Sequence, residues 1–85
     1  MQLDSEDTTP IINRLKRAQG QLAAVTRRLE EGRDCKDIVT QLSAVSKAID
    51  RAGFAIIASG LEQCLTSEDP TLDRKEMEKL FMSLA

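Results

Sequence analysis

Residues 38–65 read IVTQLSAVSKAIDRAGFAIIASGLEQCL and carry apolar side chains at alternating spacings of four and three. This spacing places the apolar side chains on one face of an α-helix. Asp34 can cap the start of that helix, and the polar stretch TSEDPT at 66–71 stops it. The pattern therefore predicts one long helix from about Cys35 to Leu65. Its apolar positions are Ile38, Leu42, Val45, Ile49, Ala52 and Ile56.

The residues on either side predict two further helices and no strand. Thr8 or Thr9 supplies an N-cap before Pro10, where a first-turn proline is favourable, and Gly32 ends this first helix. Its apolar positions are Ile11, Leu15, Ala18, Leu22, Val25 and Leu29. A short third helix is predicted over about Leu72 to Leu84. The fold class is all-α, with one domain over residues 1–85 in which residues 1–8 are flexible.

The long helix is too long for a single small domain to cover. Its 31 residues extend for roughly 46 Å, whereas a compact domain of this size has a radius of gyration near ~12 Å. Two sustained apolar stripes in one short chain predict an antiparallel hairpin that pairs with copies of itself.

Composition restricts the class of protein. The chain has 85 residues, a net charge of −2, and no histidine, tryptophan or tyrosine. The acidic, polar start MQLDSEDTTP is no secretory signal, and the longest apolar run, 52–61, is too short to cross a bilayer. We expect a cytoplasmic protein without a membrane partner. In a reducing compartment its two cysteines are more often free, metal-bound or redox-active than joined in a structural disulfide.

Cys35 and Cys64 lie 29 residues apart on one face of the long helix, which separates them by roughly 43 Å. A disulfide within one chain is therefore excluded, because it needs Cα atoms within about 7 Å. If two copies of the helix pack antiparallel about an axis near Ile49 and Asp50, residue i meets residue 99 − i. Cys35 then faces Cys64 of the partner subunit. The same register pairs Leu42 with Ile57, Val45 with Phe54, and Ile38 with Leu61.

The two cysteines have different predicted roles. Cys35 opens the helix near Arg33 and Lys36, where the helix dipole and the cations favour the thiolate, so it is the expected nucleophile. Cys64, in the last turn, is the expected resolving thiol. The alternative is that each cysteine is only a small apolar residue on a buried face.

A second group of residues is basic. On a helical wheel Arg14, Arg17, Gln21 and Arg28 fall within a strip about 60° wide, beside the apolar stripe. Lys47 and Arg51 form an i, i+4 pair on the long helix. A solvated face is the alternative, but residues 14–33 carry six basic and two acidic side chains. In a multimer this basic patch would be repeated, so the pattern predicts contact with DNA phosphates.

Residues 13–45, NRLKRAQGQLAAVTRRLEEGRDCKDIVTQLSAV, with a second cysteine at 64, resemble the copper-sensitive operon repressor (CsoR) family and its relatives for nickel, formaldehyde and persulfide. The resemblance covers about Thr9 to Leu84 and implies a disc-shaped homotetramer, a dimer of dimers, that represses transcription at operator DNA. It implies DNA contacts at Arg14 and Arg51, and the wheel adds Arg17, Gln21 and Lys47.

The chain departs from the family pattern in its sensing residues. Copper sensors of the family place a histidine four residues before the second cysteine, and this chain has Gly60 there. Nickel sensors need several histidines, and formaldehyde sensors use an N-terminal proline where this chain has Gln2. The remaining arrangement is similar to the persulfide-sensing branch, CstR, in which persulfides or polysulfides are the inducers and Cys35 becomes linked to Cys64 of the partner subunit.

Three alternatives remain open at this stage. The first is a Cu(I) repressor that binds the metal through Cys35 and Cys64. The second is a dithiol redox enzyme, although the chain has no CxxC, no histidine and no cofactor-binding loop. The third is a helical adaptor without a DNA function. We predict the repressor, with no enzymatic activity and no cofactor.

Overall fold

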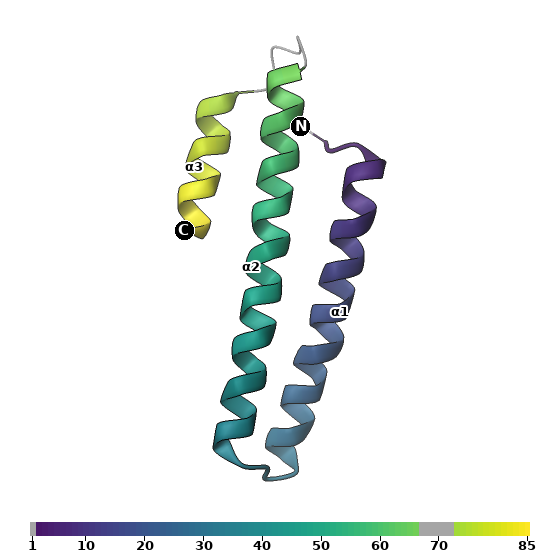
Figure 1. The fold of residues 1–85 in the computed structure, drawn as a ribbon, viewed down its shortest axis with the longest axis vertical. Coiled ribbons are helices and arrows are strands. Elements are labelled where there is room, and N and C mark those ends of the chain that lie inside the picture. Colours follow the sequence, from purple (N-terminus) through teal and green to yellow (C-terminus); the bar gives the residue numbers. More distant parts are fainter. Residues whose placement is uncertain (1, 67–72) are drawn as a thin grey trace.

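The computed structural model describes residues 2–66 and 73–85, and these residues form three α-helices and no strand. They are α1 (Ser5–Glu30), α2 (Cys35–Thr66) and α3 (Arg74–Leu84). Helices α1 and α2 form an antiparallel hairpin, and α3 folds back along the C-terminal half of α2 (Figure 1). The predicted all-α class is confirmed. No described helix meets the length and apolarity that a membrane span requires.

The N-terminal boundary of α1 differs from the prediction. The helix begins at Ser5, after Asp4, and includes Pro10. The hydroxyls of Thr8 and Thr9 donate to the Ser5 carbonyl at 3.3 and 2.9 Å, so they bond back into the helix instead of capping a later start. The predicted cap was wrong because a threonine hydroxyl can be satisfied by the carbonyl of the preceding turn as well as by an orphan N–H.

Two other sequence expectations fall partly on residues that the structure does not describe. The first is the flexible segment 1–8, of which Met1 lies outside the described residues, while residues 5–8 belong to the first turns of α1. The second is the TSEDPT stretch with the start of the third helix, because 67–72 lie outside the described residues. Helix α2 ends at Thr66, and α3 begins at Arg74 after Asp73, whose carboxylate accepts a bond from the Lys75 N–H at 2.9 Å.

The turn between α1 and α2 follows the sequence signals closely. Gly32 has a φ of +72°, a left-handed conformation that glycine adopts without a Cβ clash. Its N–H donates to the Leu29 carbonyl, and the Arg33 N–H donates to the Arg28 carbonyl, which is the bonding pattern of a Schellman C-cap. Two residues later, the Asp34 carboxylate accepts a bond from the Lys36 N–H at 3.2 Å. The chain therefore leaves one helix and enters the next within four residues.

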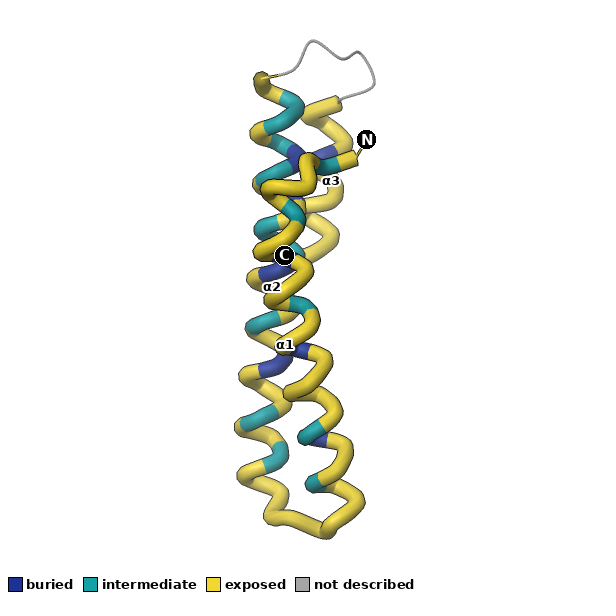
Figure 2. Tube along the Cα trace, turned by 90° about the vertical axis from the view of Figure 1, so that its right-hand side faces the viewer, coloured by how far each residue is buried: buried dark blue, intermediate teal, exposed yellow. Residues whose placement is uncertain are grey.

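The core of the hairpin uses only every second position of each predicted apolar stripe. Among the predicted stripe positions, the buried residues are Ile11, Ala18 and Val25 of α1 and Val45 and Ala52 of α2. The intervening residues Leu22, Leu29, Leu42, Ile49 and Ile56 are 40–61% exposed. Figure 2 shows how few positions along the two long helices are buried. One face of each stripe is therefore left without a partner in the single chain.

The burial pattern corrects the predicted pairing between copies. Val45 is only 2% exposed because it packs inside its own hairpin, so it cannot meet Phe54 of another chain. The ring of Phe54 lies against Phe81 of α3, with centroids 5.3 Å apart. Ile57 is also buried within the chain, at 8% exposure, so its predicted contact with Leu42 of a partner is wrong. The error arose because the apolar stripe of α2 faces more than one neighbour.

A single chain remains extended and poorly covered. The Cα radius of gyration is 16.4 Å, against about 12 Å for a compact domain of this length. The accessible surface is 6553 Å², whereas a compact monomer of this mass exposes about 5,000 Å². About 1,500 Å² of surface thus exceeds what a folded monomer normally leaves in water.

Candidate nucleic-acid interface and cysteine sites

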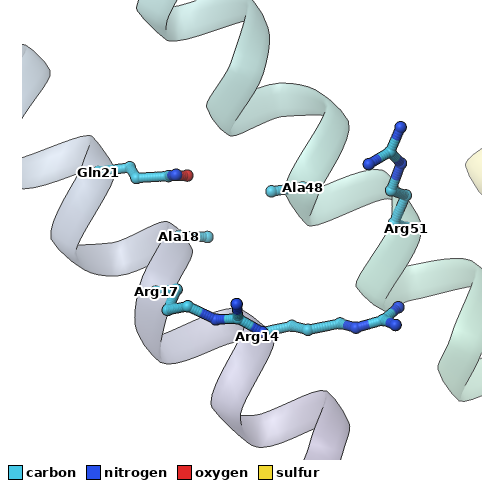
Figure 3. A pocket seen from close by; sticks show the side chains of 6 residues that line it. All are labelled: Arg14, Arg17, Ala18, Gln21, Ala48 and Arg51. Carbon is cyan, nitrogen blue, oxygen red and sulfur yellow. The ribbon is translucent and has the colours of Figure 1, made fainter.

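A groove between α1 and α2 gathers four of the five predicted DNA-contacting residues. It has a volume of about 350 Å³ and is lined by Arg14, Arg17, Ala18, Gln21, Ala48 and Arg51. Arg14 extends from α1 across the groove toward α2, and Gln21 points the same way (Figure 3). Arg51 approaches from α2. The two alanines, Ala18 and Ala48, have no side chain beyond Cβ and leave the space open between the guanidinium groups.

The helix geometry explains why these residues meet. Arg14, Arg17 and Gln21 recur at spacings of three and four, so they form one ridge along α1. Ala48 and Arg51 form the facing ridge on α2, and the antiparallel hairpin sets the two ridges side by side. Sequence periodicity predicted the ridge on α1, but on α2 it paired Arg51 with Lys47, and the wheel of one helix could not show that Arg51 lines the same groove as Arg14.

The charge of the groove is positive and uncompensated. Within residues 2–66 and 73–85 the ion pairs are Arg33 with Glu31, at 3.3 Å, and Arg74 with Glu78, at 4.0 Å. The arginines Arg14, Arg17 and Arg51 have no such partner in that part of the chain. Three unpaired guanidinium groups around one hollow repel one another and attract an anion.

Lys47, the fifth predicted contact, does not line the groove. It is exposed on α2, four residues before Arg51. Beyond the groove, the structure adds residues that the sequence reasoning did not select, namely Asp37, Thr40 and Gln41 of α2, which line two adjoining hollows. Their spacing with Ala44, Ala48 and Arg51 continues the same three-and-four ridge, and that signal could have identified them.

The two cysteines lie at opposite ends of α2. Cys35 is its first residue and is exposed, whereas Cys64 lies in its last turn and is half-buried. The main chain of the N-terminal segment covers this end of α2, because Gln63 Nε2 donates to the Gln2 carbonyl oxygen at 2.9 Å. The structure therefore agrees with the exclusion of a disulfide within one chain, and both thiols are free.

Among residues 2–66 and 73–85, the donor atoms of one chain do not fit a metal site. The described residues contain no cluster of three or more Cys, Asp or Glu side chains that could hold a metal ion, and the sequence has no histidine. The two soft thiolate ligands are separated by the length of α2. Any metal site that uses both cysteines must therefore combine two chains.

Comparison with known proteins places this arrangement in a family. The sequence model of the metal-sensitive transcriptional repressor family matches residues 7–84, which is nearly the whole chain. The chain belongs to the metal-sensitive transcriptional repressor family. The match includes both cysteines and all the residues that line the groove.

Individual relatives show where this chain stands in the metal-sensitive repressor family. The copper-sensing transcriptional repressor CsoR of Mycobacterium ulcerans is 39% identical over 56 residues, which are 66% of this chain and 48% of that protein. The copper-sensing repressor RicR of Mycobacterium tuberculosis is 36% identical over 53 residues, 62% of this chain and 55% of that protein. The uncharacterized protein YrkD of Bacillus subtilis is 49% identical over 37 residues, 44% of this chain and 59% of that protein. The matched parts span about half the length of these relatives.

A solved structure shares the fold. The nickel-responsive transcriptional regulator InrS superposes with a TM-score of 0.70 over 99% of this chain and 92% of that one, at 23% sequence identity. The three-helix arrangement is therefore the fold of a known nickel-responsive transcriptional regulator.

Proposed function

We propose that this chain is a DNA-binding transcriptional repressor that assembles as a homotetramer and releases its operator when persulfides or polysulfides link Cys35 to Cys64 of the partner subunit. The observation that carries the DNA-binding part is the groove of Figure 3, which Arg14, Arg17 and Arg51 line without a carboxylate partner in the described residues. Guanidinium groups donate several N–H bonds and suit phosphate oxygens. Family membership supports the same assignment.

Assembly is supported by the unburied half of each apolar stripe. Leu42, Ile49 and Ile56 repeat every seven residues along α2 and are 40–47% exposed. The excess surface of about 1,500 Å² per chain is larger than the roughly 800 Å² that each partner buries in a standard interface. A second copy is a suitable partner because this stripe is symmetric about Ile49.

The exposed stripe revises the register between copies. An antiparallel pair centred on Ile49 brings residue i opposite residue 98 − i, so Leu42 meets Ile56 and Ile49 meets its own copy. Cys35 then lies opposite Gln63 of the partner subunit, one residue from Cys64. The proposed cysteine pairing is compatible with this register, because the shift moves the thiols by about 1.5 Å along the helix and, at about 100° per residue, both cysteines stay within about 60° of Ile49 around the helix axis. A dimer contains two such sites.

The proposed sensing reaction needs only the inducer and the two thiols. The Cys35 thiolate attacks the sulfane sulfur of a persulfide RS–SH, so that Cys35 becomes a persulfide and RS⁻ leaves. The Cys64 thiolate of the partner subunit then attacks the sulfur bonded to Cys35 Cβ and expels HS⁻, leaving a disulfide. If Cys64 also carries an extra sulfur, the same displacement gives a trisulfide and HS⁻. The sulfane sulfur of the inducer is the oxidant in both cases.

A copper sensor is the second candidate, and one observation favours it. Two relatives with 36–39% identity are copper-sensing repressors. Cys35 and Cys64 of two chains would offer Cu(I) two soft thiolates, and Gly60 contributes no side-chain ligand at the position where the family resemblance implies a histidine for copper sensors. The persulfide reaction requires no third ligand, which is why we place it first.

A mass and gel-shift experiment separates the two candidates. We would treat the full chain with inorganic polysulfide or with Cu(I), then record the intact mass and the affinity for a duplex that the untreated protein selects from a randomised library. A covalent dimer with added sulfur and lost DNA affinity is the expected result. If Cu(I) alone releases the DNA and polysulfide gives no covalent dimer, the persulfide sensor is wrong and the copper sensor takes its place.

A further inference from the structure

The basic groove continues beyond Gln21 toward the turn of the hairpin. A second hollow of about 350 Å³ is lined by Gln21, Ala24, Arg28, Gln41 and Ala44, and it shares Gln21 with the first. A third, of about 230 Å³, is lined by Arg28, Arg33, Asp37, Thr40 and Gln41. Because neighbouring hollows share lining residues, they lie in one row along the α1–α2 seam, and we call this row the channel.

The middle of this channel can bind an anion. Arg28 and Gln41 are both half-buried, and each lines two of the three hollows. No carboxylate forms an ion pair with Arg28 within the chain segments that the structure describes. The floor beside them consists of Ala24 and Ala44, so a ligand can come close to the backbone. A guanidinium and a side-chain amide together supply N–H donors suited to phosphate oxygens.

The far end of the channel has a different charge. Asp37 contributes a carboxylate to its wall, and Arg33 is paired with Glu31 at 3.3 Å. The positive charge therefore falls along the groove, from three unpaired arginines around Ala18 to one at Arg28 and then to an acidic side chain. Asp37 repels any polyanion that extends past Arg28.

We infer that the DNA-binding surface extends along the groove to Arg28 and Gln41 and ends at Asp37, whose carboxylate weakens DNA binding. The inference rests on the proposed function, since it assigns further contacts to the same partner. Arg14 and Arg28 are 14 residues apart on α1, or roughly 21 Å. Phosphates of one strand recur about every 3.4 Å along the duplex axis, so a straight contact of this length spans about six base pairs.

Arg28→Gln tests the extension, and Arg27→Gln is the matched control. Both remove one positive charge from adjacent positions of α1, but Arg27 lines none of the three hollows. Using the library-selected duplex, we expect Arg28→Gln to weaken binding about three- to tenfold per contacting chain and to lower the salt slope by about one for each. Arg27→Gln should change neither. Arg28→Lys should retain much of the affinity, and circular-dichroism melting checks that every variant folds.

Asp37→Asn gives a result in the opposite direction. Removal of this carboxylate should strengthen DNA binding about two- to fivefold at low salt, and the gain should shrink as salt screens the charge. Asp50→Asn, at an exposed position of α2 outside the groove, is the control and should have a smaller effect. Equal gains in the two variants would show a general charge effect and would overturn the role of Asp37.

The outcomes separate this inference from the proposed function. If Arg14→Ala weakens DNA binding while Arg28→Gln behaves like Arg27→Gln, DNA stops at Gln21 and the inference alone is overturned. If Arg14→Ala and Arg28→Gln both leave the affinity unchanged, the groove is not the DNA surface and the proposed function is overturned with it. Loss of affinity in both variants, with an unchanged Arg27→Gln control, supports the extended surface.

Discussion

The ring of Phe54 on α2 packs against the ring of Phe81 on α3, with centroids 5.3 Å apart and planes inclined by 53°. These are the only aromatic residues of the chain. Beside them Gly53 approaches α3 closely, because a Cβ at this position would lie 2.8 Å from Leu84 Cδ1. Helix α3 thus packs against α2 at Gly53 and Phe54, two and three residues after Arg51, which lines the basic groove.

We expect Phe81→Ala to loosen α3 from α2. The substitution removes the aromatic pair and part of the covering of Met77, which should lower the free energy of unfolding by about 1–2 kcal/mol. Met82→Ala on the same helix is the control, because Met82 is 69% exposed. Denaturant unfolding gives the stability, and hydrogen exchange should show faster exchange confined to α3. Equal effects of the two variants would mean that the Phe54–Phe81 contact does not hold the helix.

Arg14→Ala or Arg51→Ala should weaken DNA binding without dissociating the assembly. Each contact is repeated in the tetramer, so at about 1 kcal/mol or more per charge-assisted contact the loss should reach a few kcal/mol. Lys16→Ala removes the same charge from an exposed position of α1 outside the groove and serves as the control. Gel-shift titration at moderate salt measures the affinity, and an unchanged value for both variants would remove these residues from the DNA surface.

Ile49→Asp and Val45→Asp should fail in different ways. Ile49 is 46% exposed on the apolar stripe, so its carboxylate would lie at the proposed interface and prevent association while the hairpin stays helical. Val45 is 2% exposed inside the hairpin, so its substitution should unfold α1 and α2. The difference follows from which neighbour each side chain contacts.

Sedimentation and thermal melting of these two variants distinguish the cases. Ser43→Asp, at an exposed position of α2, controls for the added charge. A folded tetramer of Ile49→Asp would show that the stripe of Leu42, Ile49 and Ile56 faces solvent in the assembly. A stable, helical Val45→Asp variant would contradict the hairpin core.

Polysulfide treatment should yield a reducible dimer joined from Cys35 of one chain to Cys64 of the partner subunit. Cys35→Ser should block the reaction, whereas Cys64→Ser should leave a persulfide on Cys35 that cannot close the cross-link, because the resolving thiol is missing. Non-reducing electrophoresis and intact mass report the two products. DNA release should be impaired in both variants, since we attribute release to the bridge.

Reductant provides the control for the cross-link. Added dithiothreitol should restore both the monomer mass and DNA binding. A cross-link between two copies of Cys35, detected by peptide mapping, would show that the subunits do not pair antiparallel through α2.

The turn and the long helix could be predicted because their signals are local. Gly32 and Asp34 act on atoms within a few residues of themselves, and the structure confirms both. The start of α1 could not be predicted in the same way, because Thr8 and Thr9 had two sets of backbone partners to choose between. Their hydroxyls bond to the Ser5 carbonyl, and α1 consequently begins five residues before Pro10.

The basic groove was half predictable. The spacing of Arg14, Arg17 and Gln21 identified the ridge on α1, since i, i+3 and i+4 neighbours share a helix face. Only the packed hairpin could show that Arg14 and Arg51 line one groove and that neighbouring hollows extend to Gln41 and Asp37.

The sequence by itself determined the three helices, the length of α2 and the separation of the two cysteines, because helical periodicity and rise are properties of the local backbone. Only the tertiary structure decided which apolar residues are used within the chain. Val45 and Ile49 belong to the same stripe, yet Val45 is buried and Ile49 is exposed. An apolar helix face can be broad enough to pack against two neighbouring helices, and the sequence pattern is the same for both contacts. Only the packed positions of α1, α2 and α3 show which apolar residues form the core and which remain exposed for another copy of the chain.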